Sequence, residues 1–471
     1  MTDSSPLWQR PATRLAAGFG AGGPDPVEVL DAVLARRESV DPTLNAVVTL
    51  DADGARRAAE ASAARWRSGA PLSPIDGVPV TVKDNIPVAG MRSTWGSLLY
   101  ADHVPERDEL PVARLRAAGA VIVGKTNVPE FTLQGYTDNR LFGLTRNPWN
   151  TGLTPGGSSG GAVAAVAAGI GPVAIGTDGG GSIRRPAAHT SLVGLKPSTG
   201  RVARIDGFPA VLHDFEVIGP IARSVDDLVA FMRVICDADP RDPLSAPFAG
   251  RPFGLPAEVA PARIRFVPRF GDSPVDPEIA ASVARAAQRL AALGHRLDED
   301  ARFDLADGVN RTAWSVISQT ALAWLMAQHP GQEAALSEPL QAMLADARAL
   351  SAAQYLDALG EVARLRRRFA ELFETVDVVM TPTTAALAWS SSEVFPSVID
   401  GRPAGPRAHA VFTAFVNAAG LPAITIPADP SAEGLPLGFQ LIGRPGADGM
   451  LCALARQFEA AHPWAGRWPA I

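Results

Sequence analysis

Residues 154–197, TPGGSSGGAVAAVAAGIGPVAIGTDGGGSIRRPAAHTSLVGLKP, contain two serine clusters that are flanked by glycine. The first cluster is GGSSGG (156–161) and the second is GGGS (179–182). The small and apolar residues between them predict a helix over 161–170 and a strand over 172–177. Glycine lets the main chain adopt unusual backbone angles and approach a substrate closely. This stretch therefore predicts an α/β fold in which two serine loops lie at opposite ends of a helix–strand unit.

The second cluster carries the candidate nucleophile, Ser182. A serine hydroxyl on a glycine loop can attack a carbonyl group, and successive backbone N–H groups can converge on the oxyanion that forms. The predicted oxyanion donors are the N–H groups of Gly179, Gly180, Gly181 and Ser182 itself.

A lysine upstream, Lys83 in VTVKDN, is the candidate base, because no histidine has a comparable setting. Serines on glycine loops together with such a lysine indicate acyl transfer by a Ser–Lys arrangement. Lys83 accepts a proton only when neutral, and its reference pKa of about 10.4 must be lowered by burial or by a nearby cation. Ser158 is placed as the proton relay between Ser182 and Lys83, and Ser159 as a supporting hydrogen-bond donor.

The rest of the chain alternates helical and strand patterns, which is typical of α/β proteins. The central part, 238–262, is rich in Pro, Asp and Ala and predicts a long surface connection. No internal repeat is evident. Helices are predicted over 25–39, 51–69, 111–118, 225–237, 280–293, 310–329, most of 332–375 and 451–461, and strands over 44–50, 77–84, 121–123, 376–382 and 422–427.

Composition excludes several classes of protein. Of 471 residues, 47% are hydrophobic and 20% are charged, which suits a globular core rather than disorder. The net charge of −6 gives no support for binding to nucleic acid or to an anionic membrane. Cys236 and Cys452 are too few and too far apart for a disulfide framework or a zinc site. The segment 1–15 lacks the order of a signal peptide, and no run is apolar enough to span a bilayer, so a cytoplasmic protein is expected.

Many short blocks resemble the amidase signature family of serine hydrolases. They occur in the family's order from about residue 77 to about residue 448, so the resemblance covers most of the chain. The blocks are GVPVTVKDN (77–85), AGAVIVGKTNVPEF (118–131), NPWN (147–150), PGGSSGG (155–161), GTDGGGSIRRPA (176–187), GLKPSTGRV (194–202), GPIARS (219–224), AAGLPAITIPAD (418–429) and GLPLGFQLIGRPGAD (434–448).

The resemblance implies one domain over 1–471, with a central mixed, twisted sheet covered by helices on both faces. It implies a signature core over about 77–230, a variable helical pocket region over about 240–375, and C-terminal strands and a helix over 376–471. It also implies that Lys83, Ser158 and Ser182 are base, relay and nucleophile, and that Asp178 and Arg184 brace the nucleophile loop.

The reaction implied is hydrolysis of a small-molecule amide without a metal or organic cofactor. Where many members of the family have a side chain before the Gly-Gly-Ser, this chain has Gly179, which bears on the acyl-group preference. The sequence leaves open whether the protein forms a homodimer.

Three motifs invite other interpretations. GAVIVGKT (119–126) fits the phosphate-loop expression, but its first half is itself strand-like. GSSGG (157–161) fits the GxSxG nucleophile elbow, but no strand precedes it, and its histidine would have to be one of His295, His329, His409 and His462. His189 lies close to Ser182 in sequence, and a structural or surface role is expected for it.

Three functional alternatives also remain. A carbamate, urethane or urea-type compound is a related C–N substrate for the same residues. An amidotransferase A subunit would channel ammonia to a partner acting on charged tRNA; 340–375 lacks the Tyr-rich segment expected there, and the chain has only 3 Tyr. A non-enzymatic binding protein on the same scaffold is opposed by the intact Lys-Ser-Ser set.

Overall fold

A long mixed sheet forms the centre of the computed structural model, which describes residues 5–300 and 303–471. Residues 1–4 of the N-terminal segment lie outside the described residues. Within the described ranges the sheet has 11 strands in the order β1-β3-β2-β4-β6-β5-β12-β13-β9-β7-β8. The strands are β1 (Val47–Leu50), β2 (Pro79–Lys83), β3 (Val121–Thr126), β4 (Val173–Asp178), β5 (Val193–Lys196), β6 (Val217–Ala222), β7 (Arg263–Phe266), β8 (Arg296–Glu299), β9 (Val378–Pro382), β12 (Ala423–Pro427) and β13 (Gly438–Gly443).

The sheet combines parallel and antiparallel pairs. β2 is parallel to both β3 and β4, and β7 is parallel to both β8 and β9. The strands between these two groups, from β4 through β6, β5, β12 and β13 to β9, pair antiparallel. The predicted α/β fold with a mixed sheet is confirmed.

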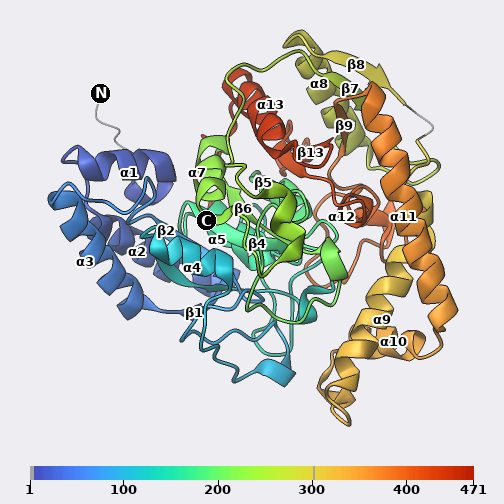
Figure 1. Cartoon of the computed structure of the whole chain (residues 1–471), viewed down its shortest axis with the longest axis horizontal. Helices are drawn as coiled ribbons and strands as arrows, with labels where there is room; N and C mark the ends of the chain where they lie inside the picture. The colour runs from blue at the N-terminus through green and yellow to red at the C-terminus, as the bar shows by residue number, and fades with distance from the viewer. Residues whose placement is uncertain (1–4, 301–302) are drawn as a thin grey trace.

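Helices flank the sheet along its length. In Figure 1 the N-terminal helices α1–α3 lie at one end of the molecule and α9–α11 at the other, with the strands between them. The helices are α1 (Ala12–Gly20), α2 (Pro26–Leu44), α3 (Ala52–Arg67), α4 (Leu110–Ala117), α5 (Gly160–Ala168), α6 (Arg184–Ala188), α7 (Val225–Ile235), α8 (Pro277–Ala292), α9 (Trp314–Ala327), α10 (Glu338–Ala347), α11 (Ala352–Thr375), α12 (Ala414–Ala418) and α13 (Asp448–Ala461).

The central helix α5 is buried along its whole length against β2, β3 and β4. Its sequence, GGAVAAVAA, contains only small or β-branched residues, so its backbone can lie close to the sheet. A Cβ at Gly161 would lie 2.3 Å from the backbone nitrogen of Asn127. Glycine is therefore required where this helix leaves the first serine loop.

The helix predicted over 25–39 is longer than the sequence indicated, because α2 continues through Pro42 to Leu44. Asp25 begins it with a capping box that involves Glu28, and Pro26 takes the first helical position. Asn45 then ends it in the left-handed conformation, and the Asp41 carboxylate accepts a hydrogen bond from the N–H of Ala46 at 2.7 Å. The strand predicted over 44–50 consequently begins later, at Val47.

The region 240–375 is not purely helical. Besides α8–α11 it contributes β7 and β8, two parallel strands at one edge of the sheet. The sequence did not indicate these strands, because RIRF and RLDE are only 4 residues each and carry several charges.

None of the helices in residues 5–300 and 303–471 combines the length and the apolar character needed to cross a membrane.

Candidate active site

Lys83 is the last residue of β2, and its side chain is fully buried. The neighbouring parallel strand β4 ends at the same edge with Thr177 and Asp178. Lys83 Nζ donates hydrogen bonds to Ser158 Oγ at 2.8 Å, to Thr177 Oγ1 at 2.8 Å and to the Thr177 carbonyl at 3.2 Å. The sequence placed Lys83 at a strand end; the structure adds Thr177, which orients the amine from the adjacent strand.

Burial lowers the pKa of Lys83 from 10.5 to about 7. The negative charges of Glu216 and Asp178 oppose this shift, and the positive charges of Arg204 and Arg185 add to it. A substantial fraction of Lys83 is therefore the neutral amine near neutral pH, which is the form that accepts a proton.

The two serine clusters meet in space. Ser159, directly before α5, donates its backbone N–H to the carbonyl of Ser182 at 3.2 Å. Its hydroxyl donates to the Thr177 carbonyl at 3.3 Å. Ser158 and Ser159 are fully buried, whereas Ser182 is 6% exposed and lines a pocket. Ser158 thus lies in contact with the lysine, and Ser182 lines the pocket.

A buried ion pair supports the loop that carries Ser182. Arg184 donates to the Asp178 carboxylate through Nε and Nη2, both at 3.0 Å, and both side chains are fully buried. Asn417, on α12, adds a hydrogen bond to the same carboxylate at 2.9 Å. Burial alone would raise the pKa of Asp178, but the Arg184 guanidinium outweighs it and holds that pKa below its usual range.

One of the predicted oxyanion donors, the N–H of Gly181, is bound within the protein. The N–H of Gly181 donates to Asp178 Oδ1 at 2.7 Å, so it is engaged in the support of the loop. Within the described part of the chain, the N–H groups of Gly179, Gly180 and Ser182 donate to no carbonyl or side chain. These three remain as candidate donors to a substrate oxygen. Gly181 has a φ of +113° and a Cβ there would lie 2.3 Å from Thr413 Oγ1, so glycine is needed at this position for the conformation itself.

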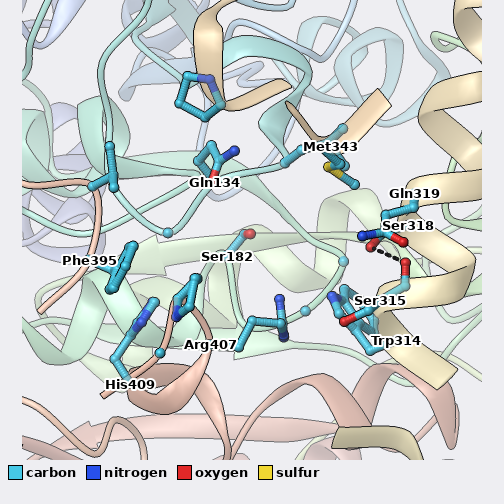
Figure 2. Close-up of a pocket in the computed structure, with 18 of the residues that line it drawn as sticks. Gln134, Ser182, Trp314, Ser315, Ser318, Gln319, Met343, Phe395, Arg407 and His409 are labelled. Atoms are coloured by element: carbon cyan, nitrogen blue, oxygen red, sulfur yellow. Dashed lines mark hydrogen bonds between the residues drawn. The ribbon is translucent and has the colours of Figure 1, made fainter. Parts of the chain in front are cut away.

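A cavity of about 630 Å³ opens in front of Ser182. Figure 2 shows Ser182 between two walls, one from the chain segment with Trp314 and Gln319 and the other with Phe395, Arg407 and His409. The first wall belongs to α9 and to the π-helical turn η6 (Val309–Ala313) before it, with α10 adding Met343. A cavity of this size suits a small molecule rather than a polypeptide segment.

The sequence missed most residues of these walls, because nothing in a local motif indicates which distant helix or loop will face a serine. The aromatic residues near the motifs, Trp95, Phe131, Tyr136 and Phe142, do not line the pocket. Trp314 and Phe395 supply its aromatic surface instead. The only available indication was the helical pocket region expected over about 240–375, which contains the wall from α9 and α10 but not Phe395, Arg407 or His409.

The rival motifs are ordinary structure. Lys125 of GAVIVGKT lies within β3, fully buried, and donates to Ser93 Oγ and to the carbonyl of Ile86, both at 2.7 Å. No strand directly precedes GSSGG. His189 is buried rather than exposed.

Of the downstream histidines, His409 lines the pocket with Ser182. In the ranges 5–300 and 303–471, no group of three or more His, Cys, Asp or Glu side chains is placed to hold a metal ion.

Comparison with known proteins gives the class. Residues 28–452 match the sequence model of the family described as Amidase. The chain is 37% identical over 469 residues to the A subunit of glutamyl-tRNA(Gln) amidotransferase from Synechococcus sp. (strain CC9605), covering 93% of this chain and 94% of that one. It is 33% identical over 475 residues to an acylamidase of Rhodococcus erythropolis, covering 100% and 99%.

The fold agrees with a solved structure of the same class. The crystal structure of a bacterial aryl acylamidase of the amidase signature (AS) enzymes family superposes with a TM-score of 0.89 at 30% identity, covering 98% of this chain and 100% of that one. The chain belongs to the amidase signature family of enzymes.

Proposed function

We propose that this protein hydrolyses a carboxylic amide to an acid plus ammonia or an amine. The observation that carries the proposal is the 2.8 Å contact between Lys83 Nζ and Ser158 Oγ, formed by a buried lysine whose pKa is lowered to about 7. A neutral amine in contact with a hydroxyl is the arrangement that a Ser–Ser–Lys relay requires.

In the proposed reaction, Ser182 Oγ attacks the amide carbonyl and its proton passes to Ser158, whose own proton passes to Lys83. The oxyanion is bound by the free N–H groups of Gly179, Gly180 and Ser182. Lys83 and Ser158 then return a proton to the leaving nitrogen, and the C–N bond breaks to give an ester on Ser182. Water attacks this ester with the same relay as base, and the acid leaves.

The first test is the mass of the intact protein after treatment with a small fluorophosphonate, followed by peptide mapping. We expect one adduct on Ser182 in the wild type, none in Ser182→Ala, and slow labelling in Lys83→Ala. An adduct on Ser159, or labelling of Lys83→Ala at the wild-type rate, would contradict the relay. Hydrolysis of a panel of amides, esters and carbamates then defines the substrate class.

The similarity to amidotransferase A subunits supports a second candidate, release of ammonia from an amide for use by partner subunits. The two functions differ in what the isolated chain does. A hydrolase turns over simple anilides alone, whereas a subunit of this kind needs its partners for amide transfer. Turnover of anilides by the purified chain supports the hydrolase, and labelling of Ser182 without turnover of any amide supports the amidotransferase role.

A further inference from the structure

Two arginines and a histidine gather in the pocket without acidic partners. This basic cluster consists of Arg185, on α6 directly after the nucleophile loop, together with Arg407 and His409 from the C-terminal part of the chain. All three line the cavity in front of Ser182, and Figure 2 shows the Arg407 and His409 side chains on the same side of the serine.

The polar atoms of the cluster are largely unsatisfied. Arg185 is 6% exposed, its Nε has no hydrogen-bond partner, and its Nη2 reaches only the Gly157 carbonyl at 3.3 Å. His409 is 4% exposed, and neither of its ring nitrogens has a partner. Arg407 makes no side-chain hydrogen bond or ion pair within the described ranges; it lies over the ring of Trp314 at 5.1 Å. Arg407 is half-buried, whereas Arg185 and His409 are buried. Buried donors without partners are rare and costly, so the acceptor groups of a molecule in this cavity would be bound favourably.

Other arginines near the site are paired, which sets this cluster apart. Arg184 binds Asp178, Arg204 binds Glu109 and Glu216, and Arg311 at the pocket wall binds Asp307. Glu216 lines the cavity too, but its carboxylate is held by Arg204 at 2.7 Å. Asp346 lines the cavity from α10 but forms no ion pair with either arginine. The charge of Asp178 raises the pKa of Arg185, yet its carboxylate is bound by Arg184, so no carboxylate of the described residues contacts Arg185 or Arg407.

The two guanidinium groups also repel each other. Burial lowers the pKa of Arg185 to about 10, and burial together with the charge of Arg185 lowers the pKa of Arg407 to about 9. Both stay positively charged near neutral pH. Burial and these two charges lower the pKa of His409 well below 6.5, so its ring is neutral and offers one donor and one acceptor. A bound anion would relieve the repulsion and satisfy the donors.

We propose that the substrate is an amide that carries a carboxylate group, and that Arg185 and Arg407 bind this carboxylate while His409 donates to it. The inference rests on the proposed amide hydrolysis and defines its substrate class. Planar guanidinium groups match a planar carboxylate by paired hydrogen bonds. The cavity of about 630 Å³ has room for the reacting amide and a charged substituent together.

The test compares pairs of substrates in which one member carries a carboxylate and the other an uncharged alkyl group at the same end. Glutaric acid mono-4-nitroanilide and hexanoic acid 4-nitroanilide place the carboxylate or a methyl end on the acyl side. 4-Acetamidobenzoate and 4-methylacetanilide do the same on the amine side. We expect kcat/KM to favour the carboxylate member of one pair by roughly 10- to 100-fold, as for a charge-assisted hydrogen bond to a buried guanidinium.

Arg407→Met and Arg407→Gln should lose most of this preference, whereas Arg311→Met, which removes a paired arginine of the same pocket, should keep it. Only the ratio within each pair is compared, so a general loss of activity does not affect the result. On the wild type alone, glutarate or benzoate should compete with the neutral substrate of its pair.

Turnover of neutral substrates without a preference for either carboxylate partner would overturn this inference alone, as would a preference unchanged in both Arg407 variants. Absence of turnover and of Ser182 labelling would instead overturn the proposed function and this inference with it.

Discussion

The ionisation of Lys83 should control the pH dependence of the reaction. With a pKa of about 7, about one tenth of Lys83 is neutral at about pH 6 and about nine tenths at about pH 8. Because the neutral amine is the proposed base, kcat/KM should rise about tenfold between these pH values and level off above them. A lysine with an ordinary pKa would give a rate that still rises tenfold per unit above pH 8.

The assay is kcat/KM for a neutral 4-nitroanilide between about pH 5.5 and 9.5, because the absorbance of nitroaniline does not change in this range. Lys196 provides a matched control. It is also fully buried, and burial lowers its pKa to about 7 as well. Its Nζ donates to the Pro197 carbonyl at 2.8 Å and makes no hydrogen bond to Ser158 or Ser182, although its charge acts on the Asp178–Arg184 pair. Lys196→Met should keep the inflection near pH 7, and Lys83→Met should remove turnover.

Two results would refute this reasoning. A profile that is flat between about pH 6 and 8 would mean that no group of this pKa limits the reaction. If the inflection disappeared in Lys196→Met, the group that limits the reaction would be Lys196 and not Lys83.

Three further predictions concern single side chains around the site. Thr177→Val removes an acceptor of the Lys83 ammonium, so the inflection should move to lower pH by about one unit; a move to higher pH would contradict the contact at 2.8 Å. Gly181→Ala places a Cβ against a threonine hydroxyl at positive φ and should slow fluorophosphonate labelling at least about 100-fold. Gly179→Ala should slow it far less, because its φ is not positive and its one close contact is a leucine methyl at the end of a flexible side chain. Lys196→Met should change the pH dependence of stability. Between the folded pKa of about 7 and the unfolded value of 10.5, the unfolded wild type binds more protons than the folded protein, so the wild-type free energy of unfolding should rise with pH relative to the variant by about 1.4 kcal/mol per pH unit. Equal dependence on pH in wild type and variant, measured by urea titrations, would refute this.

The sequence predicted the fold class because the strands near the site are apolar runs bounded by turn residues. β2 and β4 are buried at every position, which matches the runs at 77–84 and 172–177. It did not predict β7 and β8, whose short charged segments become strands only by pairing next to β9. The extension of α2 through Pro42 likewise depends on contacts of Asp41 beyond the helix.

The candidate site was predictable where the chemistry is local in sequence. Two glycine–serine loops and a lysine at a strand end pointed to Lys83, Ser158 and Ser182, and parallel pairing of β2 with β4 brings the lysine to Thr177. The direction of the Gly181 N–H was not predictable, since it depends on the position of a carboxylate that is itself held by α6 and α12. Arg407 and His409 lie more than two hundred residues from Ser182, and no motif marks them.

The candidate catalytic residues and the cavity wall come from different parts of the chain, which has an evolutionary consequence. The lysine and serines come from residues 83–182, whereas most of the cavity wall comes from 310–346 and 394–409. Substitutions in the wall can therefore alter which molecule is admitted while the reacting groups keep their positions. A combinatorial library confined to those two segments would test new substrates while the proposed catalytic residues stay unchanged. Such drift would fit a family in which relatives that are 33% and 37% identical to this chain carry the names of an acylamidase and of an amidotransferase component.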